Sequence, residues 1–319
     1  GLGEAGGSPP SHSMLSDYFP EEQSGTALSI YTTGIYLGIF FGYFAGGWIA
    51  DTYGWRNAFF IVGIPGVVLA VLLLLLVREP ARSFLPNTVE NEKASFKETI
   101  VFLLQRPAFW WIALGCSTAS FVGYGNGNFF PSLLIRNYGL TVTEVGMFMG
   151  VISGSTGMLG TFLGGYLADR WGKRDKRWYV RIALWGLILS LPLSYYTLLG
   201  SEPLHVVLAY TPAHILNTLY LGPCIAICHT LAAPNMRASA SAVLLFVINM
   251  IGLGLGPLVV GTLSDAYSPI FGEENLRYAM LTALTMGTLG VFFFWMAHRT
   301  LLADISKIEA ALTARTATS

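Results

Sequence analysis

The sequence contains little charge and little cysteine. Only 11% of its 319 residues are Asp, Glu, Lys or Arg, whereas a soluble globular domain has about 25%, and 53% are hydrophobic. This composition excludes a soluble enzyme and a disordered chain, because both need far more polar surface. The 3 cysteines are too few for a disulfide-stapled secreted module. Because 18 basic residues balance 18 acidic ones, no net field favours a nucleic-acid partner.

Motifs for metal, cofactor or ATP binding are also missing. Cys116, Cys224 and Cys228 lie in apolar runs, and no fourth ligand or finger spacing accompanies them or the adjacent His229. We interpret them as buried free thiols and expect no metal and no cofactor. The sequence has no phosphate-cradling loop of the ATP-binding type, which argues against direct ATP coupling.

The apolar residues are grouped in runs of about 20 residues, the length that crosses ~30 Å of hydrocarbon. The pattern predicts an all-α membrane protein with one partial span, residues 1–19, and eight full spans. The full spans are approximately 24–50, 57–77, 108–135, 144–168, 179–199, 204–231, 238–264 and 277–298. The tail after His298 alternates charged and apolar residues, which indicates a short amphipathic helix and a frayed end.

The basic residues predict the orientation of these spans. The loops near 78–107, 169–181 and 232–237, together with the tail, hold 15 of the 18 Lys and Arg residues, and the opposite side holds only Arg56, Arg136 and Arg277. Basic residues favour the cytoplasmic side, so we expect the long loop and the C-terminus to be cytoplasmic.

The sequence also contains a repeat with a shift of 214 positions. The shift aligns Pro20 with Pro234 and Asp51 with Asp265, and several glycines also align. Both copies run in the same membrane direction, because an even number of spans and the long loop separate them. Parallel repeats of this kind are typical of the two halves of a major facilitator transporter.

Two stretches carry a resemblance to a known family. Residues 164–174 read Gly-Gly-Tyr-Leu-Ala-Asp-Arg-Trp-Gly-Lys-Arg, which resembles the signature loop of the major facilitator superfamily, and a similar stretch covers 45–56. The segments Gly3-Glu4-Ala5, Ser16-Asp17-Tyr18-Phe19-Pro20, Gly54-Trp55-Arg56 and Arg78-Glu79-Pro80 resemble the bacterial relatives of Spinster transporters. The resemblance implies a fold of twelve helices in two pseudo-symmetric six-helix halves that work by alternating access.

On that resemblance the chain is truncated at its N-terminus to about nine transmembrane helices, the fourth to the twelfth. Residues 1–77 would be an incomplete N-terminal half, 78–107 a cytoplasmic interdomain loop, 108–298 the C-terminal half and 299–319 a cytoplasmic tail. The chain begins at Gly1 rather than Met, and its opening residues read as the inside of a helix. We therefore expect a parent protein with three further spans and a first copy of the signature loop.

Glu4 is the candidate for proton coupling. Of the 18 acidic residues, it alone sits well inside a predicted span, 13 residues before Asp17 and hence about 20 Å along the helix. An ionisable group at such depth is costly and suggests function, and the resemblance also places a glutamate here. The alternative is an ion pair with a basic residue of the missing first helix that stabilises packing only.

Polar residues within other spans outline a candidate solute pathway. The alternating glycines of residues 123–128 weaken a helix, so we expect a break there, as in helices that line substrate sites. Lipid cannot satisfy the polar groups of His214 or Asn217, which share a helix face with Leu221, so both should face the lumen. A flexible gate and a single interhelical hydrogen bond are the alternatives. The pathway candidates are Tyr31, Tyr36, Tyr124, Asn126, Asn128, His214, Asn217, Tyr220 and Asn249.

The signature loop supplies a candidate gate. Gly164 and Gly165 allow close helix approach, and Asp169 can pair with a basic group or with a neighbouring helix N-terminus. The gate candidates are Gly165, Asp169, Arg170, Gly172 and Arg174. The basic residues also have a simpler explanation, which is the cytoplasmic bias of positive charge.

The residues and the resemblance together predict a secondary active transporter of a small organic solute, lipid-like, amphipathic or anionic, with proton coupling. A sugar-acid or organic-anion symporter of the same superfamily is the alternative. An enzyme or receptor is disfavoured, because only one embedded acid is present and a receptor needs no duplicated halves. We expect a monomer in the lipid bilayer of a bacterial inner membrane, with a small-molecule substrate and no nucleic-acid partner.

Overall fold

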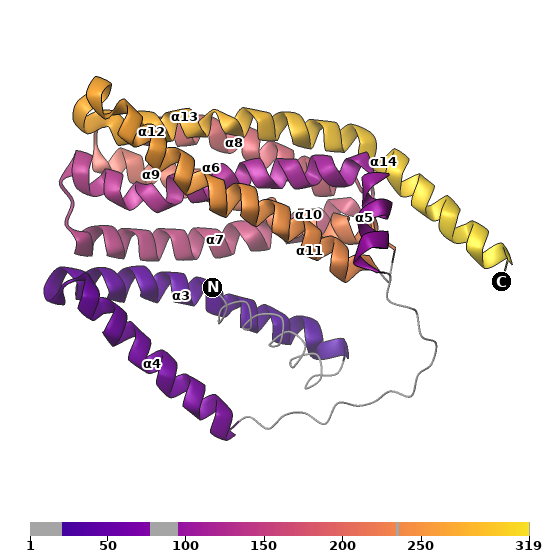
Figure 1. Ribbon diagram of the computed structural model, residues 1–319, viewed down its shortest axis with the longest axis horizontal. Coiled ribbons are helices and arrows are strands. Elements are labelled where there is room, and N and C mark those ends of the chain that lie inside the picture. The colour runs from indigo at the N-terminus through magenta and orange to yellow at the C-terminus, as the bar shows by residue number, and fades with distance from the viewer. Residues whose placement is uncertain (1–20, 77–94, 234–235, 319) are drawn as a thin grey trace. The chain divides into compact units, whose positions relative to one another are not determined.

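The computed structural model describes residues 21–76, 95–233 and 236–318, which form helices and contain no strand (Figure 1). Glu4 and the predicted partial span 1–19 lie outside the described residues. The chain divides into two compact units. One contains Gly1–Glu90 and Thr141–Ser155, and the other contains Asn91–Leu140 and Thr156–Ser319. The chain passes from one unit to the other inside the predicted interdomain loop, just before the helix that begins at Val142, and again within that helix.

The first unit consists of α3 (Glu21–Tyr53), α4 (Trp55–Leu76) and the beginning of α7 (Val142–Gly172). The beginning of α7 packs closely on α3, because a side chain at Gly146 would lie only 2.5 Å from the carbonyl oxygen of Tyr43. The Thr143 hydroxyl donates a hydrogen bond of 2.7 Å to the carboxylate of Asp51 at the end of α3. The most apolar window of α4 has a mean hydropathy of 3.0, which is typical of a lipid-facing helix.

The second unit is a helical bundle around α6 (Pro107–Tyr138), which packs against the helices from the C-terminal part of the chain. Its core includes Phe109 and Ile112 of α6 and Phe294 of α14, all almost fully buried. The other elements are α5 (Phe96–Leu104), α8 (Trp178–Leu199), α9 (Pro203–Thr218), α10 (Leu221–Thr230), α11 (Arg237–Ile248), the π-helix η2 (Asn249–Leu255), α12 (Gly256–Phe271), the 3₁₀ turn η3 (Gly272–Glu274), α13 (Asn275–Leu284) and α14 (Met286–Thr318).

Four helical stretches of the described residues are long and apolar enough to cross a membrane, and the bent pair α5–α6 adds a fifth. One of the four, Ser239–Ile308, has 70 residues, so it would extend roughly 100 Å if straight, about three times the hydrocarbon thickness. It instead reverses near η3, so α11–η2–α12 and α13–α14 run in opposite directions (Figure 1). The predicted span near 24–50 falls on α3, and the one near 204–231 falls on α9 and α10. These helices are not among the membrane-crossing stretches counted above.

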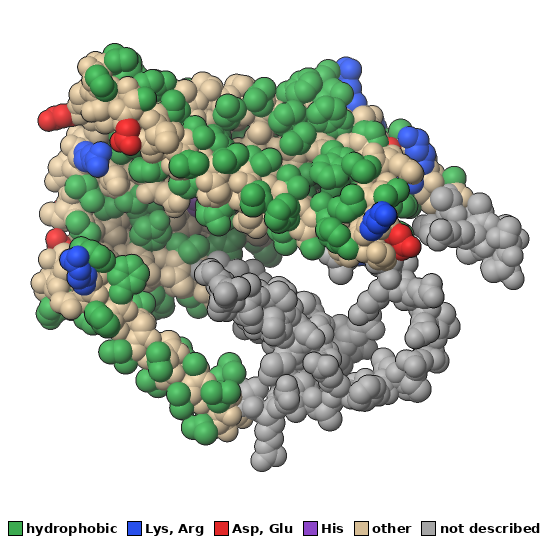
Figure 2. All heavy atoms as spheres, viewed as in Figure 1, with side chains coloured by type: hydrophobic (Ala, Val, Ile, Leu, Met, Phe, Trp, Pro, Cys, Tyr) green, Lys and Arg blue, Asp and Glu red, His purple; other side chains and the backbone are tan. Residues whose placement is uncertain are grey.

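The surface pattern agrees with a membrane-embedded bundle. Figure 2 shows hydrophobic side chains over the middle of the helices, with charged side chains gathered towards their two ends. Many of the exposed large hydrophobic side chains lie on α4, α7 and α14. A belt of exposed apolar side chains between charged ends is the arrangement that lipid requires.

The structure corrects the expected break in one helix and extends the last helix. The helix break expected in residues 123–128 is wrong, because α6 is continuous from Pro107 to Tyr138. The reason is packing. Gly125 lies directly against the Gly256 backbone, and a side chain at position 125 would come within 3.1 Å of the Gly256 carbonyl oxygen. The tail after His298, expected to form a short amphipathic helix and then fray, is helical and continues α14 to Thr318.

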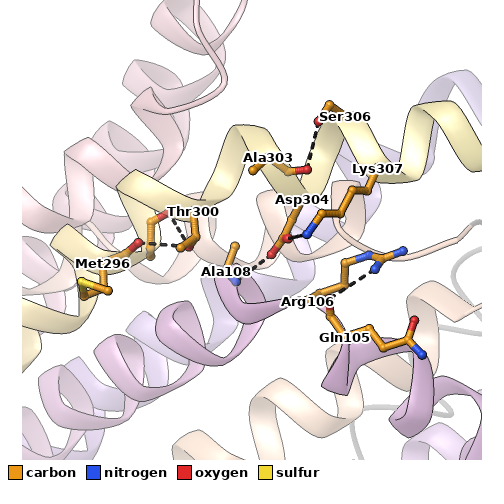
Figure 3. A network of polar contacts seen from close by, with 10 residues as sticks. Gln105, Arg106, Ala108, Met296, Thr300, Ala303, Asp304, Ser306 and Lys307 are labelled. Atoms are coloured by element: carbon orange, nitrogen blue, oxygen red, sulfur yellow. Dashed lines mark hydrogen bonds and ion pairs between the residues drawn. The ribbon is translucent and has the colours of Figure 1, made fainter.

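This extension of α14 is fixed to the start of α6 by Asp304 (Figure 3). The Asp304 side chain, only 2% exposed, accepts a hydrogen bond of 2.9 Å from the backbone N–H of Ala108, in the first turn of α6. The ammonium group of Lys307 lies 3.5 Å from the same carboxylate. A carboxylate at a helix N-terminus both satisfies a free donor and interacts favourably with the helix dipole.

Candidate functional site

A chain of polar and aromatic contacts joins α6, α7 and α9 inside the second unit. His214 of α9 shares a hydrogen bond of 2.7 Å with the Thr156 hydroxyl of α7. Its ring stacks on Tyr210, with centroids 5.4 Å apart, and Tyr210 in turn stacks on Phe130 of α6 at 4.5 Å. The imidazole is therefore positioned by a hydrogen bond to α7 and by a ring of its own helix that in turn stacks on α6.

A second contact joins α6 to the junction between α9 and α10. The hydroxyl groups of Tyr220 and Ser120 share a hydrogen bond of 2.5 Å. Nearby, the amide oxygen of Asn217 lies beside Gly123, and a side chain at position 123 would come within 3.4 Å of that oxygen. His214, Asn217 and Tyr220 thus all contact neighbouring helices of this unit. The face that His214 and Asn217 were expected to share with Leu221 is interrupted, because α9 ends at Thr218 and Leu221 begins α10.

The three polar residues in the glycine-rich part of α6 differ in their surroundings. Tyr124 is 43% exposed and Asn128 is also exposed. The side-chain oxygen of Asn126 is buried and has no hydrogen-bond partner among the described residues. A buried polar atom without a partner costs about 1–3 kcal/mol and calls for an explanation such as a ligand or an ordered water.

The other pathway candidates have simpler surroundings. Asn249 begins η2 and donates a hydrogen bond of 2.9 Å to the Leu245 carbonyl of α11, the helix before it. Tyr36 lies half-buried on α3 in the first unit. Tyr31 is on the same helix, but its side chain lies outside the described part of the chain.

The signature loop forms a compact turn between α7 and α8. The hydroxyl of Tyr179, in the first turn of α8, donates a hydrogen bond of 3.0 Å to the Asp169 carboxylate. Gly172 makes this contact possible, because any side chain there would occupy the position of the Tyr179 ring. Asp169 therefore contacts the beginning of the next helix through a tyrosine rather than through a basic group.

The other candidate residues of the signature loop contact different groups. The Arg170 guanidinium donates to the Tyr166 hydroxyl at 3.0 Å, and the backbone N–H of Arg174 donates to the Trp171 carbonyl. A side chain at Gly164 would clash with the backbone of Leu219, which explains the glycine there. Gly165 has open space where a side chain would stand, so it does not need to be glycine for packing on the described residues.

The charge at the end of this loop is paired. Asp175 accepts hydrogen bonds from Arg177 and lies 3.2 Å from Arg181. Partial burial opposes ionisation of Asp175, but the hydrogen bonds from Arg177 and the charges of both arginines outweigh it. The pKa of Asp175 is therefore below its usual value.

Sequence reasoning missed four contact residues: Ser120, Thr156, Tyr179 and Tyr210. Hydroxyl groups are frequent in apolar spans and usually bond their own helix, so nothing in the sequence separates Ser120 and Thr156 from the other Ser and Thr residues. No group of three or more His, Cys, Asp or Glu residues that could hold a metal ion occurs in the described residues. The three cysteines are free and buried.

Comparisons with known proteins agree with this architecture. Residues 1–257 match the family model of the Major Facilitator Superfamily. The chain belongs to this superfamily. An MFS-type efflux pump of Mycolicibacterium smegmatis is 33% identical over 306 residues, which cover 95% of this chain and 70% of the pump. Protein spinster homolog 1 of Xenopus tropicalis is 26% identical, over 92% of this chain and 60% of that protein.

A solved structure is also similar. It is the crystal structure of a bacterial homolog of the human lysosomal transporter Spinster, in an inward-facing and unoccupied conformation. It matches with a TM-score of 0.84 and 27% sequence identity, over 95% of this chain and 76% of that chain. The expected resemblance to Spinster-like members of the superfamily and the expected all-helical major facilitator fold are confirmed. The chain is thus an integral membrane protein of a transporter family.

Proposed function

We propose that this major facilitator protein is a secondary active transporter that moves a small amphipathic or anionic organic solute by alternating access. The observation that carries the proposal is the row of polar contacts through α6, α7 and α9. His214 with Thr156, and Tyr220 with Ser120, place hydrogen-bonding groups in the interior of an otherwise apolar bundle. Polar groups at membrane depth are costly and usually serve a pathway for solutes or ions.

Asn126 supports a direct solute contact. Its buried side-chain oxygen has no partner among the described residues. A solute hydroxyl or amine would satisfy this acceptor. The aromatic faces of Tyr210 and Phe130 nearby would suit the apolar part of the same molecule.

Proton coupling is assigned to Glu4, which lies outside the described residues. Burial raises the pKa of a carboxyl group, and a neighbouring cation lowers it, so a change of exposure between two states could load and release one proton. Glu4→Gln keeps the shape and the hydrogen-bonding capacity but cannot ionise. Proton-driven accumulation should therefore vanish, while exchange of solute down its own gradient should persist.

The test of coupling is uptake into vesicles that contain the purified protein and carry an imposed pH gradient. Glu273→Gln is the matched control, because this exposed carboxylate lies in η3 near a helix end. We expect the control to accumulate solute at the wild-type level and Glu4→Gln to equilibrate it only. Accumulation by Glu4→Gln with the wild-type dependence on external pH would refute the assignment.

The Asp169–Tyr179 contact is proposed as part of the gate. If it holds one state of the transport cycle closed, Asp169→Asn and Tyr179→Phe should both slow turnover more than they lower abundance. Tyr166→Phe is the control, since it removes a hydroxyl that contacts Arg170 in the same loop. Unchanged turnover in both test variants would mean that the loop helps only to set the orientation of the protein in the membrane.

Export is the proposed direction, because the mycobacterial relative is named an efflux pump. A sugar-acid or organic-anion symporter remains the alternative, and inverted vesicles distinguish the two by the side on which solute accumulates. We also propose a monomer in a bacterial inner membrane with the long loop and C-terminus in the cytoplasm. Labelling of Lys307→Cys by an impermeant thiol reagent from the cytoplasmic side only would support that orientation.

A further inference from the structure

A group of basic side chains gathers where the start of α8 packs against α14. Arg177 and Arg181 come from the start of α8, and His298 and Arg299 come from α14. Asp175, in the turn before α8, lies 3.0 Å from Arg177 and 3.2 Å from Arg181, and α8 packs against α14, so these five residues form one group. We refer to it as the α8–α14 basic cluster.

The cluster has more positive than negative charge. Asp175 lies 3.0 Å from Arg177 and 3.2 Å from Arg181, and it is the one carboxylate in the cluster. Arg177 and Arg181 therefore share one carboxylate. Arg177 and Arg181 remain 38% and 26% exposed, so their outer N–H groups are accessible. A guanidinium carries five donors, and one carboxylate cannot satisfy two such groups.

Two tryptophans fix the level of these arginines along the helices. The Arg181 guanidinium lies over the Trp178 ring at 5.2 Å from its centroid, and that of Arg299 lies over the Trp295 ring at 3.9 Å. Tryptophan is enriched where hydrocarbon meets headgroups, and a guanidinium stacked on a ring keeps its N–H edge free. The side-chain nitrogen Nδ1 of His298 is buried and has no hydrogen-bond partner among the described residues.

We propose that the α8–α14 basic cluster binds the phosphodiester group of an anionic phospholipid in the cytoplasmic leaflet. The paired N–H groups of an arginine match two phosphate oxygens, and the tryptophans place the arginines at the depth of the lipid headgroups. The predicted orientation places the cluster in the cytoplasmic leaflet, which contains the anionic lipids. The acyl chains would lie along the exposed apolar surface of α8, which includes Trp185 and Leu189. This proposal does not depend on the solute or on proton coupling.

The experiment is a lipid titration of the full chain in a neutral detergent, followed by native mass spectrometry. Phosphatidylglycerol and phosphatidylcholine with the same acyl chains are the two probes. The test variant carries Arg181→Gln and Arg299→Gln, and the control carries Arg136→Gln and Arg237→Gln, two exposed arginines at other helix ends. A basic residue near an anionic surface contributes about fivefold in affinity, so the test variant should bind phosphatidylglycerol about 25-fold more weakly.

The control should bind phosphatidylglycerol as the wild type does, and phosphatidylcholine should bind weakly to all three. Equal loss in both double variants, or equal binding of the two lipids by the wild type, would overturn the proposal. Competition by millimolar inorganic phosphate at the wild-type cluster would also overturn it, since the site would then hold free phosphate. A variant with Arg181→Lys and Arg299→Lys keeps the charge and checks folding, and it should retain more phosphatidylglycerol than the glutamine pair.

Discussion

Replacing Asp304 by Ala should loosen the attachment of the C-terminal helix to the bundle. The Asp304 carboxylate is 2% exposed and accepts the Ala108 N–H at 2.9 Å, so its removal leaves a buried donor without a partner (Figure 3). A hydrogen bond to a charged group contributes about 1.5–3 kcal/mol, and burial of the carboxylate offsets part of this. We expect Asp304→Ala to lower the free energy of unfolding by about 2 kcal/mol. Asp304→Asn keeps an oxygen acceptor but not the charge, and should cost about 1 kcal/mol.

Thermal unfolding in a neutral detergent, followed by tryptophan fluorescence, measures the effect. The expected decrease in Tm is roughly 4–8 °C for Asp304→Ala and half of that for Asp304→Asn. Lys307→Gln is the control, because the Lys307 side chain is 60% exposed and its ammonium nitrogen lies 3.5 Å from the carboxylate, so loss of this charge should cost less than about 0.5 kcal/mol. An Asp304→Ala variant as stable as the Lys307→Gln control would show that the contact does not hold α14 to α6.

Three further predictions concern the site and the loop. Asn126→Leu removes a buried unpaired acceptor, so it should raise stability by about 1 kcal/mol while it weakens solute transport, measured by Tm and by uptake. Gly164→Ala should lower Tm by several degrees, about 2 kcal/mol of overpacking, whereas Gly165→Ala should not. The pKa of Asp175 is lowered in the folded state, so Asp175 stabilises the fold above its unfolded pKa of about 4, and this stabilisation is lost as the pH falls below that value. The stability of Asp175→Asn should therefore depend less on pH in this acidic range.

The positions of the helices could largely be predicted from the sequence, because hydrocarbon thickness fixes the length of an apolar run. The span expected at 179–199 is α8, and the one at 57–77 is α4. The break within 204–231 was not predicted, although Pro223 is its cause. Proline has no N–H, so the Leu219 carbonyl four residues earlier loses its helical partner, and α9 gives way to α10 at Leu219–Tyr220.

The glycines of α6 show why local propensity fails in such a bundle. Each glycine weakens an isolated helix, yet lipid offers no hydrogen bonds to a broken backbone, and Gly125 gains close contact with Gly256. The contact partners depend on which helices meet, and that is a property of the tertiary fold. Asp304 was also not predicted as a contact residue. It lies on the same helical face as Leu301, Ile305 and Ile308, all of which are buried.

The central claim, a transporter whose solute moves with protons through Glu4, is tested most directly by proton movement. Vesicles that contain the protein and a lumenal pH indicator would be challenged with amphipathic and anionic organic solutes. We expect that at least one such solute causes a proton flux, and that the flux disappears in Glu4→Gln but persists in Glu273→Gln. A solute that crosses the membrane with no proton flux, or with the same flux in Glu4→Gln, would contradict it.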